Sequence, residues 1–199
     1  MKKIKTLTLL ILLLTLAFPF SSYGERLGFE INANTSDVEG KIDVRIPHYE
    51  TDLFAGVGGL YSEDNYFISN VNFFLRDEIF SPALTLGLGF KGVYGRAEID
   101  DTDYDLASLN FALLGRYDFR RDNYQLPISV EAGFSAATKP LCFNDTERYI
   151  DFSCTVYGHI VNNAAVLVGG RYLDIRFDEG AGEVKTRDHA IFFGCKLFL

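Results

Sequence analysis

Three histidines and a group of aspartates are the side chains in this sequence that could perform acid–base chemistry. A histidine held by a carboxylate can take a proton from water and start a hydrolysis. The candidates are His48, His159, His189, Asp100, Asp101, Asp103, Asp105 and Asp188. Neighbouring residues of a strand point to opposite faces, so Asp188 is expected to point away from His189. We therefore interpret these residues as solvated rim residues and expect no catalytic role for them.

A second candidate is the G-x-G-x-x-G pattern of Gly87, Gly89 and Gly92, within ALTLGLGFKGVYGR at 83–96. A dinucleotide site needs a helix that begins at these glycines and presents its N–H groups to the pyrophosphate. Apolar residues instead alternate straight through the glycines, and no helical pattern follows. We interpret 83–96 as a strand whose glycines make room inside a narrow barrel or relieve its curvature.

Two further features bear on metal and thiol chemistry. EIDDTDYD at 98–105 carries five carboxylates, which hard cations prefer, but it lacks the spacing, glycine and distal glutamate of an EF-hand. We interpret it as a solvated acidic loop. Cys142, Cys154 and Cys195 are an odd number without a C-x-x-C pair, which indicates structural thiols. We expect no cofactor and no metal.

The N-terminus looks like an export signal. Lys2, Lys3 and Lys5 precede an apolar run that ends at Ser22-Tyr23-Gly24, which is the layout of a cleaved signal peptide. Residues 1–24 are therefore expected to be removed, leaving a domain at 25–199. Loss of three lysines changes the net charge from −8 to −11, which argues against nucleic acid as a partner.

Period-two alternation dominates the remainder of the chain. Ten segments carry apolar residues at every second position. They are 27–34, 41–47, 52–61, 66–75, 83–96, 106–117, 128–136, 149–160, 164–177 and 189–199. Most are about 9–14 residues long, whereas strands of soluble proteins average about 5–6 and tilted membrane-spanning strands need about 9–11. The pattern predicts a membrane-spanning, antiparallel up-and-down β-barrel of ten strands, or of eight if the weak segment 41–47, cut short by Pro47, fails to pair.

The connections predict an orientation. Short turns at 48–52 and 161–163 are expected on the periplasmic side, and the longer charged segments 95–105, 138–147 and 178–187 on the outer side. Tyr61, Tyr94 and Tyr172 would then form an aromatic girdle near the outer interface, with Tyr117 near the inner one.

The inward parity predicts a charged barrel interior. It is expected to carry Glu30, Asp43, Glu131 and Asp151 together with Arg45, Lys91, Arg116, Arg171 and Lys196. These charges are too few and too balanced for a selective pore, and a barrel of this size is largely filled by its side chains. Counting from the ends of the first and last strands places Glu30 opposite Lys196, or else each of them meets another inward charge such as Asp43.

The sequence also resembles a known family. GGLYSEDN (58–65), SPALTLGLGFKG (81–92), LLGRYDF (113–119) and RYIDF…VNNAAVLVGGRYLDIRFDEG (148–180) are similar, in this order, to the YfaZ family of putative outer-membrane proteins. The resemblance covers most of 50–199 and implies location and fold, without an activity. Phe193, Leu197, Phe198 and Leu199 are similar to the C-terminal signal for outer-membrane assembly, except that the chain ends on Leu where Phe is usual.

We conclude that the sequence predicts a small bacterial outer-membrane barrel, with a polar, largely plugged interior and a structural or surface-binding role. Its expected partners are outer-membrane lipid and, through the last strand, the assembly machinery. The alternatives are a narrow pore for small solutes and an outer-membrane hydrolase that uses the rim Asp and His residues.

The signal peptide gives a first testable prediction. Protein purified from membranes of an exporting host should begin at Glu25, because cleavage is expected after Gly24. Intact-mass spectrometry measures this directly. A chain that retains Met1 to Gly24 would mean that the apolar run stays as an anchor.

Overall fold

The computed structural model describes residues 26–48, 51–63, 66–99, 102–122, 126–178 and 183–199. The expected signal peptide 1–24 and the domain's first residue lie outside these ranges. Nearly all described residues lie in strands, and the described part of the chain contains no helix long and apolar enough to cross a membrane. The strands are β1 (Arg26–Ala33), β2 (Asp37–His48), β3 (Thr51–Ser62), β4 (Tyr66–Glu78), β5 (Leu84–Ile99), β6 (Thr102–Asp118), β7 (Ile128–Thr138), β8 (Cys142–Asn144), β9 (Thr146–Val161), β10 (Ala164–Asp178) and β11 (Glu183–Phe198).

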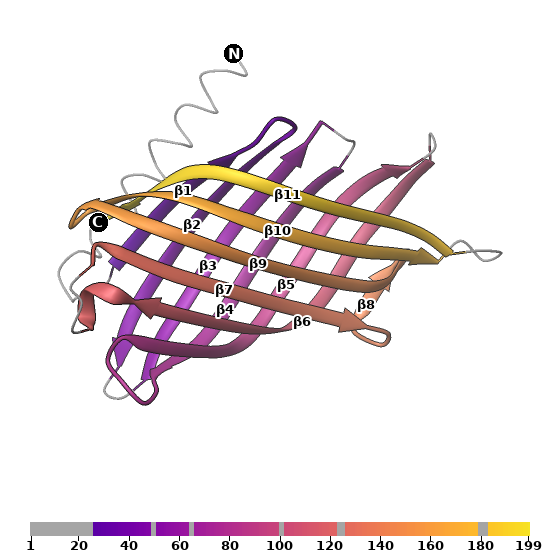
Figure 1. The fold of residues 1–199 in the computed structure, drawn as a ribbon. Helices are drawn as coiled ribbons and strands as arrows, with labels where there is room; N and C mark the ends of the chain where they lie inside the picture. The colour runs from indigo at the N-terminus through magenta and orange to yellow at the C-terminus, as the bar shows by residue number, and fades with distance from the viewer. Residues whose placement is uncertain (1–25, 49–50, 64–65, 100–101, 123–125, 179–182) are drawn as a thin grey trace, which may run out of the picture.

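These strands close into a single antiparallel barrel (Figure 1). Apart from the short β8, each strand pairs with the next along the chain, β7 pairing with β9, and β1 pairs with β11 to complete the ring. The short β8 continues β7 along the same neighbour, because β7 pairs with Phe111–Asp118 of β6 and β8 with Leu106–Ser108. If β7 and β8 are counted as one strand position, the barrel wall has ten strands. This confirms the predicted ten-stranded, all-β up-and-down barrel.

The eight-strand alternative is wrong because β2 is a full strand. It pairs with β1 from Val38 to Arg45 and with β3 from Asp37 to His48. Pro47 lies next to the last residue of this strand, opposite Asp52, where a missing N–H interrupts little of the ladder.

One parity of every long strand turns outward and is apolar. Exposed fractions reach 66% at Leu88, 62% at Val71 and 70% at Ile191. We call this surface the apolar belt. It comprises Ile31, Ile42, Val57, Val71, Phe73, Leu75, Leu86, Leu88, Phe90, Leu109, Phe111, Leu113, Phe134, Phe152, Val156, Val166, Val168, Ile191, Phe193 and Leu197. A band of this size on an exposed surface is typical of a protein that buries it elsewhere, as in a lipid bilayer.

The two ends of the barrel differ from what the loops predicted. The start of β1 and the end of β11 lie at one end, which we call the terminal end, where the backbones of Leu27 and Leu199 exchange two hydrogen bonds. The longest connection between strands, from Asp118 to Ile128 with the 3-10 helix η2 (Phe119–Arg121), also lies there. Loop length therefore does not distinguish the two ends of this barrel in the way the sequence predicted.

At the opposite end, the far end, the expected loops are largely strand. β5 continues to Ile99 and β6 starts at Thr102, so the described residues of 95–105 pair as two strands. Cys142–Asn144 and Thr146 onward are strand within 138–147, and β11 starts at Glu183 within 178–187. These extensions carry charge outward, as at Arg96, which lies 3.7 Å from Asp103 and 3.4 Å from Asp105.

The three glycines of 83–96 do not share one role. Gly87 and Gly89 lie on the interior parity, and a Cβ atom on Gly89 would come within 1.9 Å of the Phe73 carbonyl oxygen of β4. Gly89 therefore permits a close approach of two strands that no other residue allows. Gly92 lies on the outward parity with Tyr94, so the expectation that it makes room in the interior is wrong.

The apolar belt generates the second prediction. If the belt faces hydrocarbon, Leu88→Arg should lower the free energy of unfolding by about 2–4 kcal/mol, the cost of an arginine at mid-bilayer. Refolding titrations in lipid vesicles measure this, with Leu88→Ala as the control that removes the leucine without adding charge. Equal, small effects of both substitutions would mean that Leu88 does not contact lipid.

Candidate functional site

The barrel interior is the candidate site because buried charges, aromatic side chains and a cavity meet there. It has three layers along the barrel axis. An apolar layer lies toward the far end, a charged layer surrounds a cavity at mid-height, and a layer of aromatic and charged side chains lies toward the terminal end. Alternation along the strands brings all of them inward.

The layer toward the far end is the interior apolar cluster. Its members are Leu60, Tyr66, Ile68, Val93, Ala97, Tyr104, Leu106, Tyr149, Leu173, Ile175 and Phe177. The rings of Tyr104 on β6 and Phe177 on β10 stack with centroids 5.0 Å apart, and Phe177 is fully buried. Residues of β3–β6 thus pack directly against residues of β9 and β10. Here the two walls meet face to face, like the layers of a sandwich.

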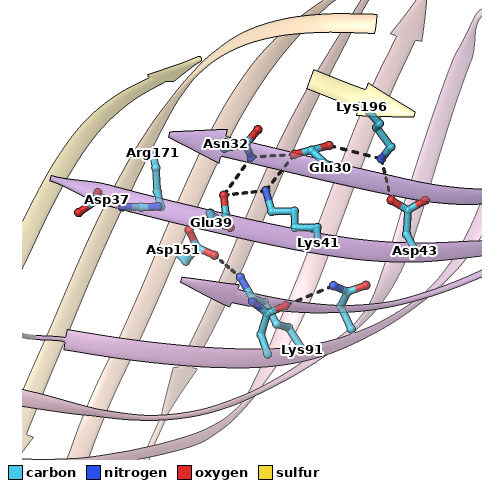
Figure 2. A network of polar contacts seen from close by, with 12 residues as sticks. Glu30, Asn32, Asp37, Glu39, Lys41, Asp43, Lys91, Asp151, Arg171 and Lys196 are labelled. Carbon is cyan, nitrogen blue, oxygen red and sulfur yellow. Dashed lines mark hydrogen bonds and ion pairs between the residues drawn. The ribbon is translucent and has the colours of Figure 1, made fainter. Parts of the chain in front are cut away.

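The charged layer begins at the seam between β1 and β11, shown in Figure 2. Glu30 of β1 lies 3.3 Å from Lys41 Nζ of β2 and 3.4 Å from Lys196 Nζ of β11. Lys196 also lies 2.7 Å from Asp43, and Lys41 lies 3.1 Å from Glu39. Each charged side chain in this row of ion pairs contacts one or two opposite charges. These contacts offset the free-energy cost of removing the charge from water.

Asn32 and Tyr157 complete the partners of Glu30. The amide of Asn32 donates to Glu30 at 2.9 Å and to Glu39 at 3.1 Å. The Tyr157 hydroxyl of β9 donates to Glu30 at 3.1 Å. Glu30 is only 3% exposed, so these donors satisfy oxygens that water does not reach freely.

Two further contacts cross the lumen between strands that are not neighbours. Lys91 Nζ of β5 lies 2.5 Å from Asp151 of β9. Arg171 of β10 lies 2.6 Å from Asp37 of β2, a strand that is not its neighbour, and also 3.0 Å from Asp188 of the neighbouring β11. Tyr66 of β4 donates to Asp188 at 2.5 Å and lies 3.3 Å from Arg171. These pairs hold opposite walls of the barrel together.

Arginines and aromatic rings fill the layer toward the terminal end. Arg76 and Arg116 lie 3.4 Å and 3.6 Å from the carboxylate of Glu131 on β7. The Arg76 guanidinium lies 4.1 Å from the centre of the Phe54 ring, a distance typical of a cation–π contact. Tyr157 packs in a second apolar group with Ala165, Leu167 and Phe192.

Between the apolar and the arginine layers lies a cavity of about 140 Å³. Charged residues of all these networks line it, along with Asn70, Asn72, Ser135 and Ser153. The Oδ1 atom of Asn72 and the Oγ atom of Ser135 are buried there without a protein hydrogen-bond partner. Such a cavity is polar and large enough for several water molecules.

Each of the nine interior charges predicted from the sequence has a charged partner in the structure. Arg45, for instance, pairs with Asp52 of β3, and Glu30 lies opposite Lys196 in the ladder as the seam prediction requires. The prediction missed Asp37 and Glu39, because 37–40 was not assigned to a strand, and it also missed Lys41, Arg76 and Asp188. The interior alternation of Asp37, Glu39 and Lys41 with Val38 and Gly40 was the available signal.

The groups considered for catalysis lie apart from one another. His189 turns outward with its ring 4.9 Å from that of Tyr172, whereas Asp188 turns inward to Arg171. His159 Nε2 lies 3.0 Å from Ser129 Oγ, a pair that sequence spacing did not indicate, but Ser129 is fully buried. Asp100 and Asp101 lie outside the described residues. Among residues that are described, no group of His, Cys, Asp and Glu could hold a metal ion.

The cysteines and the C-terminal residues have structural positions. Cys142, Cys154 and Cys195 are free thiols, on β8, β9 and β11. Phe193, Leu197 and Leu199 turn outward, with exposed fractions of 52–70%. Phe198 turns inward, against the Tyr157 group and 6.2 Å from the His159 ring.

No protein-family model and no curated protein matches the sequence. Among solved structures, the KdgM porin is similar with a TM-score of 0.45 and 6% identity, over 87% of this chain and 96% of that chain. The KdgM porin in complex with disordered oligogalacturonate gives 0.39 and 11%, over 86% and 98%. Outer-membrane expressed OmpT of Vibrio cholerae gives 0.40 and 10%, over 82% of this chain and 56% of that chain.

The seam network generates the third prediction. Lys196→Met should lower the free energy of unfolding by about 3–5 kcal/mol, since it removes the cation that pairs with the carboxylates of Asp43 and Glu30. Glu30→Gln should cost less, since Lys196 keeps Asp43 and Lys41 keeps Glu39 as partners. The double variant should lose at least about 1 kcal/mol less than the sum, because the two residues share one network. Urea titrations of the refolded barrel measure this cycle.

Lys139 provides the control for this cycle. It is 54% exposed and pairs with Asp178 at the far end, so Lys139→Met combined with Glu30→Gln should be additive. Strict additivity of Glu30→Gln with Lys196→Met as well would contradict the pairing at the seam.

Proposed function

We propose that this protein is a small bacterial outer-membrane barrel, closed to solutes, with a structural or surface-binding role and no catalysis. The apolar belt around the whole wall supports the membrane location, because a surface of this kind is stable in hydrocarbon and costly in water. The charged strand extensions at the far end support placing that end outside the cell. The terminal end then faces the periplasm.

The closed interior rests on one observation above all, the interior apolar cluster. Its side chains come from opposite walls and are almost fully buried, such as Leu173 at 1% and Ile175 at 1%. No separate plug is needed, since the walls themselves fill the lumen. The cluster makes much of the interior toward the far end apolar, whereas the sequence predicted a polar, largely plugged interior.

The absence of catalysis is part of the proposal. Its support is that the rim candidates are separated, with His189 outside the barrel and Asp188 engaged inside it. The Ser129 hydroxyl, which contacts His159, accepts a hydrogen bond from Arg116 at 3.2 Å and is buried from any substrate. The hydrolase alternative would need a nucleophile or base that substrate can reach.

A narrow pore for small solutes is the second candidate. The observation that favours it is the polar cavity at mid-height, whose charged walls resemble the middle of a channel. For conduction, the interior apolar cluster would have to separate. Its fully buried members, Phe177 among them, make this a large rearrangement.

The partners of the barrel also belong to this proposal. Lipid would cover the apolar belt, and the assembly machinery would bind the last strand through Phe193, Leu197, Phe198 and Leu199. Membership of the YfaZ family remains a prediction that rests on the ordered motifs between 58 and 180.

Planar-bilayer recording tests the proposal directly. The refolded wild type should give no steady conductance, because the apolar cluster blocks the lumen. Leu173→Ala combined with Phe177→Ala removes apolar volume from the block and should admit current, whereas Phe193→Ala, on the belt, should not. Steady conductance of the wild type would contradict a closed barrel and establish the pore.

A further inference from the structure

The half of β11 nearest the far end of the barrel has a neighbouring strand on one side only. β11 pairs with β10 from Glu183 to Leu197, but it pairs with β1 only from Phe193 to Phe198, because β1 ends at Ala33. No ladder of the described residues covers the second side of 183–192. In Figure 1 this part of β11 runs with β10 beyond the tip of the β1–β2 hairpin. We call it the open edge.

The register shows which backbone groups the open edge presents. The N–H of Leu199 donates to Leu27 of β1, and that of Phe198 donates to Asn163 on the β10 side. Successive residues of a strand direct their N–H and C=O groups to opposite sides. Odd-numbered residues of β11 therefore face the β1 side, and in the open edge Arg187, His189 and Ile191 direct their backbone groups away from β10.

Most of the open edge lies between the apolar belt and the far end of the barrel. Ile191 is the residue of the belt on β11 that lies nearest the far end. Continuing toward the far end, the next residues that turn outward are His189, Arg187 and Lys185. Unpaired backbone groups are not tolerated in hydrocarbon, so the part of the open edge beyond the belt, from Glu183 to Ala190, must lie in water, where a partner can reach it.

The open edge is also held in place. Arg171 contacts Asp188 of β11 and Asp37 at the start of β2, at 3.0 Å and 2.6 Å. On the same face Val184 packs against the interior apolar cluster. An edge fixed in this way loses little conformational freedom when it binds, which favours affinity.

Basic side chains flank the outward face of the open edge. Arg148, Arg176 and Lys185 lie directly opposite one another on β9, β10 and β11. Asp174 lies one pair further down and contacts Arg148 at 2.9 Å and Arg187 at 3.3 Å. This face is therefore rich in cations, although the chain carries a net charge of −8.

We propose that the open edge of β11 binds an extended acidic polypeptide segment, which adds to the sheet as a further strand. Backbone hydrogen bonds would give the affinity, as in other cases of strand addition. Acidic residues at alternate positions would face Lys185, Arg187 and His189, with apolar residues between them. The inference rests on the proposed surface-binding role and names the class of partner.

A second copy of the chain fits this edge less well. Antiparallel pairing of two open edges around a twofold axis places Arg187 and its neighbours opposite the same cations of the partner. Like charges directly opposite on paired strands are destabilising. The charge of the edge thus selects an acidic strand over self-association.

The test uses the full refolded protein in detergent micelles and a labelled peptide of alternating glutamate and valine. Fluorescence anisotropy should show binding of this peptide and none of the peptide with lysine in place of glutamate. Amide hydrogen exchange at Arg187 and His189 should slow when the peptide binds, because a merely electrostatic contact leaves these N–H groups open.

His189→Pro and His189→Ala form the matched pair. Proline removes the N–H that faces the open side but leaves the ladder to β10 intact, whereas alanine removes only the side chain. Binding should weaken about fivefold in His189→Pro and change less than about twofold in His189→Ala, since a hydrogen bond contributes about 1 kcal/mol and 1.4 kcal/mol is tenfold.

Three outcomes would overturn the inference: no binding of the glutamate–valine peptide, equal binding by His189→Pro and wild type, or a dimer of the wild type that His189→Pro abolishes. The last would mean that the edge binds a second copy. None of these measurements depends on conductance, so failure of this inference leaves the closed barrel standing, and a conducting barrel leaves this test unaffected.

Discussion

Pairing of β1 with β11 is the interaction on which the rest of the barrel depends. An antiparallel sheet with two free edges inside the apolar belt would expose backbone N–H and C=O groups to hydrocarbon, and closure removes both edges at once. Closure also determines which interior side chains meet, since it places the residues of the first and last strands side by side. The Glu30–Lys196 pair exists because this register exists.

Closure creates a second demand, which the interior charges meet. A narrow lumen holds little water, so a charge inside it needs an opposite charge within reach. Acids and bases from different strands supply one another, in chains at the seam and in single pairs across the lumen, such as Lys91 with Asp151. Toward the far end the barrel meets the same demand mainly by packing apolar walls together, and the charges that border them are paired, as Arg171 is with Asp37 and Asp188.

The alternation of apolar and polar residues predicted much of this architecture from the sequence. Alternation showed which face of each strand is apolar, and it placed nine interior charges by parity alone. It could not show what stands across the lumen, because that depends on closure and on the shape of the cross-section. The apolar interior around Phe177 was invisible for this reason. The extensions of β5 and β6 were missed because Arg96, Asp103 and Asp105 point to water on strands, and such residues resemble a loop in the sequence. The start of β2 was missed because its charges point inward.

The position of β1 and β11 at opposite ends of the chain has a consequence for the order of folding. Every other ladder of the wall joins segments that follow one another closely, and each can form as a hairpin. The ladder between Gly28–Ala33 and Phe193–Phe198 must bring together the two most distant parts of the domain, and it is short. The entropic cost of closing the loop is therefore greatest for this ladder. Its contacts offset that cost only after the hairpins between β1 and β11 have formed and shortened the effective loop. The barrel is therefore expected to pass through an open, curved sheet whose two edges meet last.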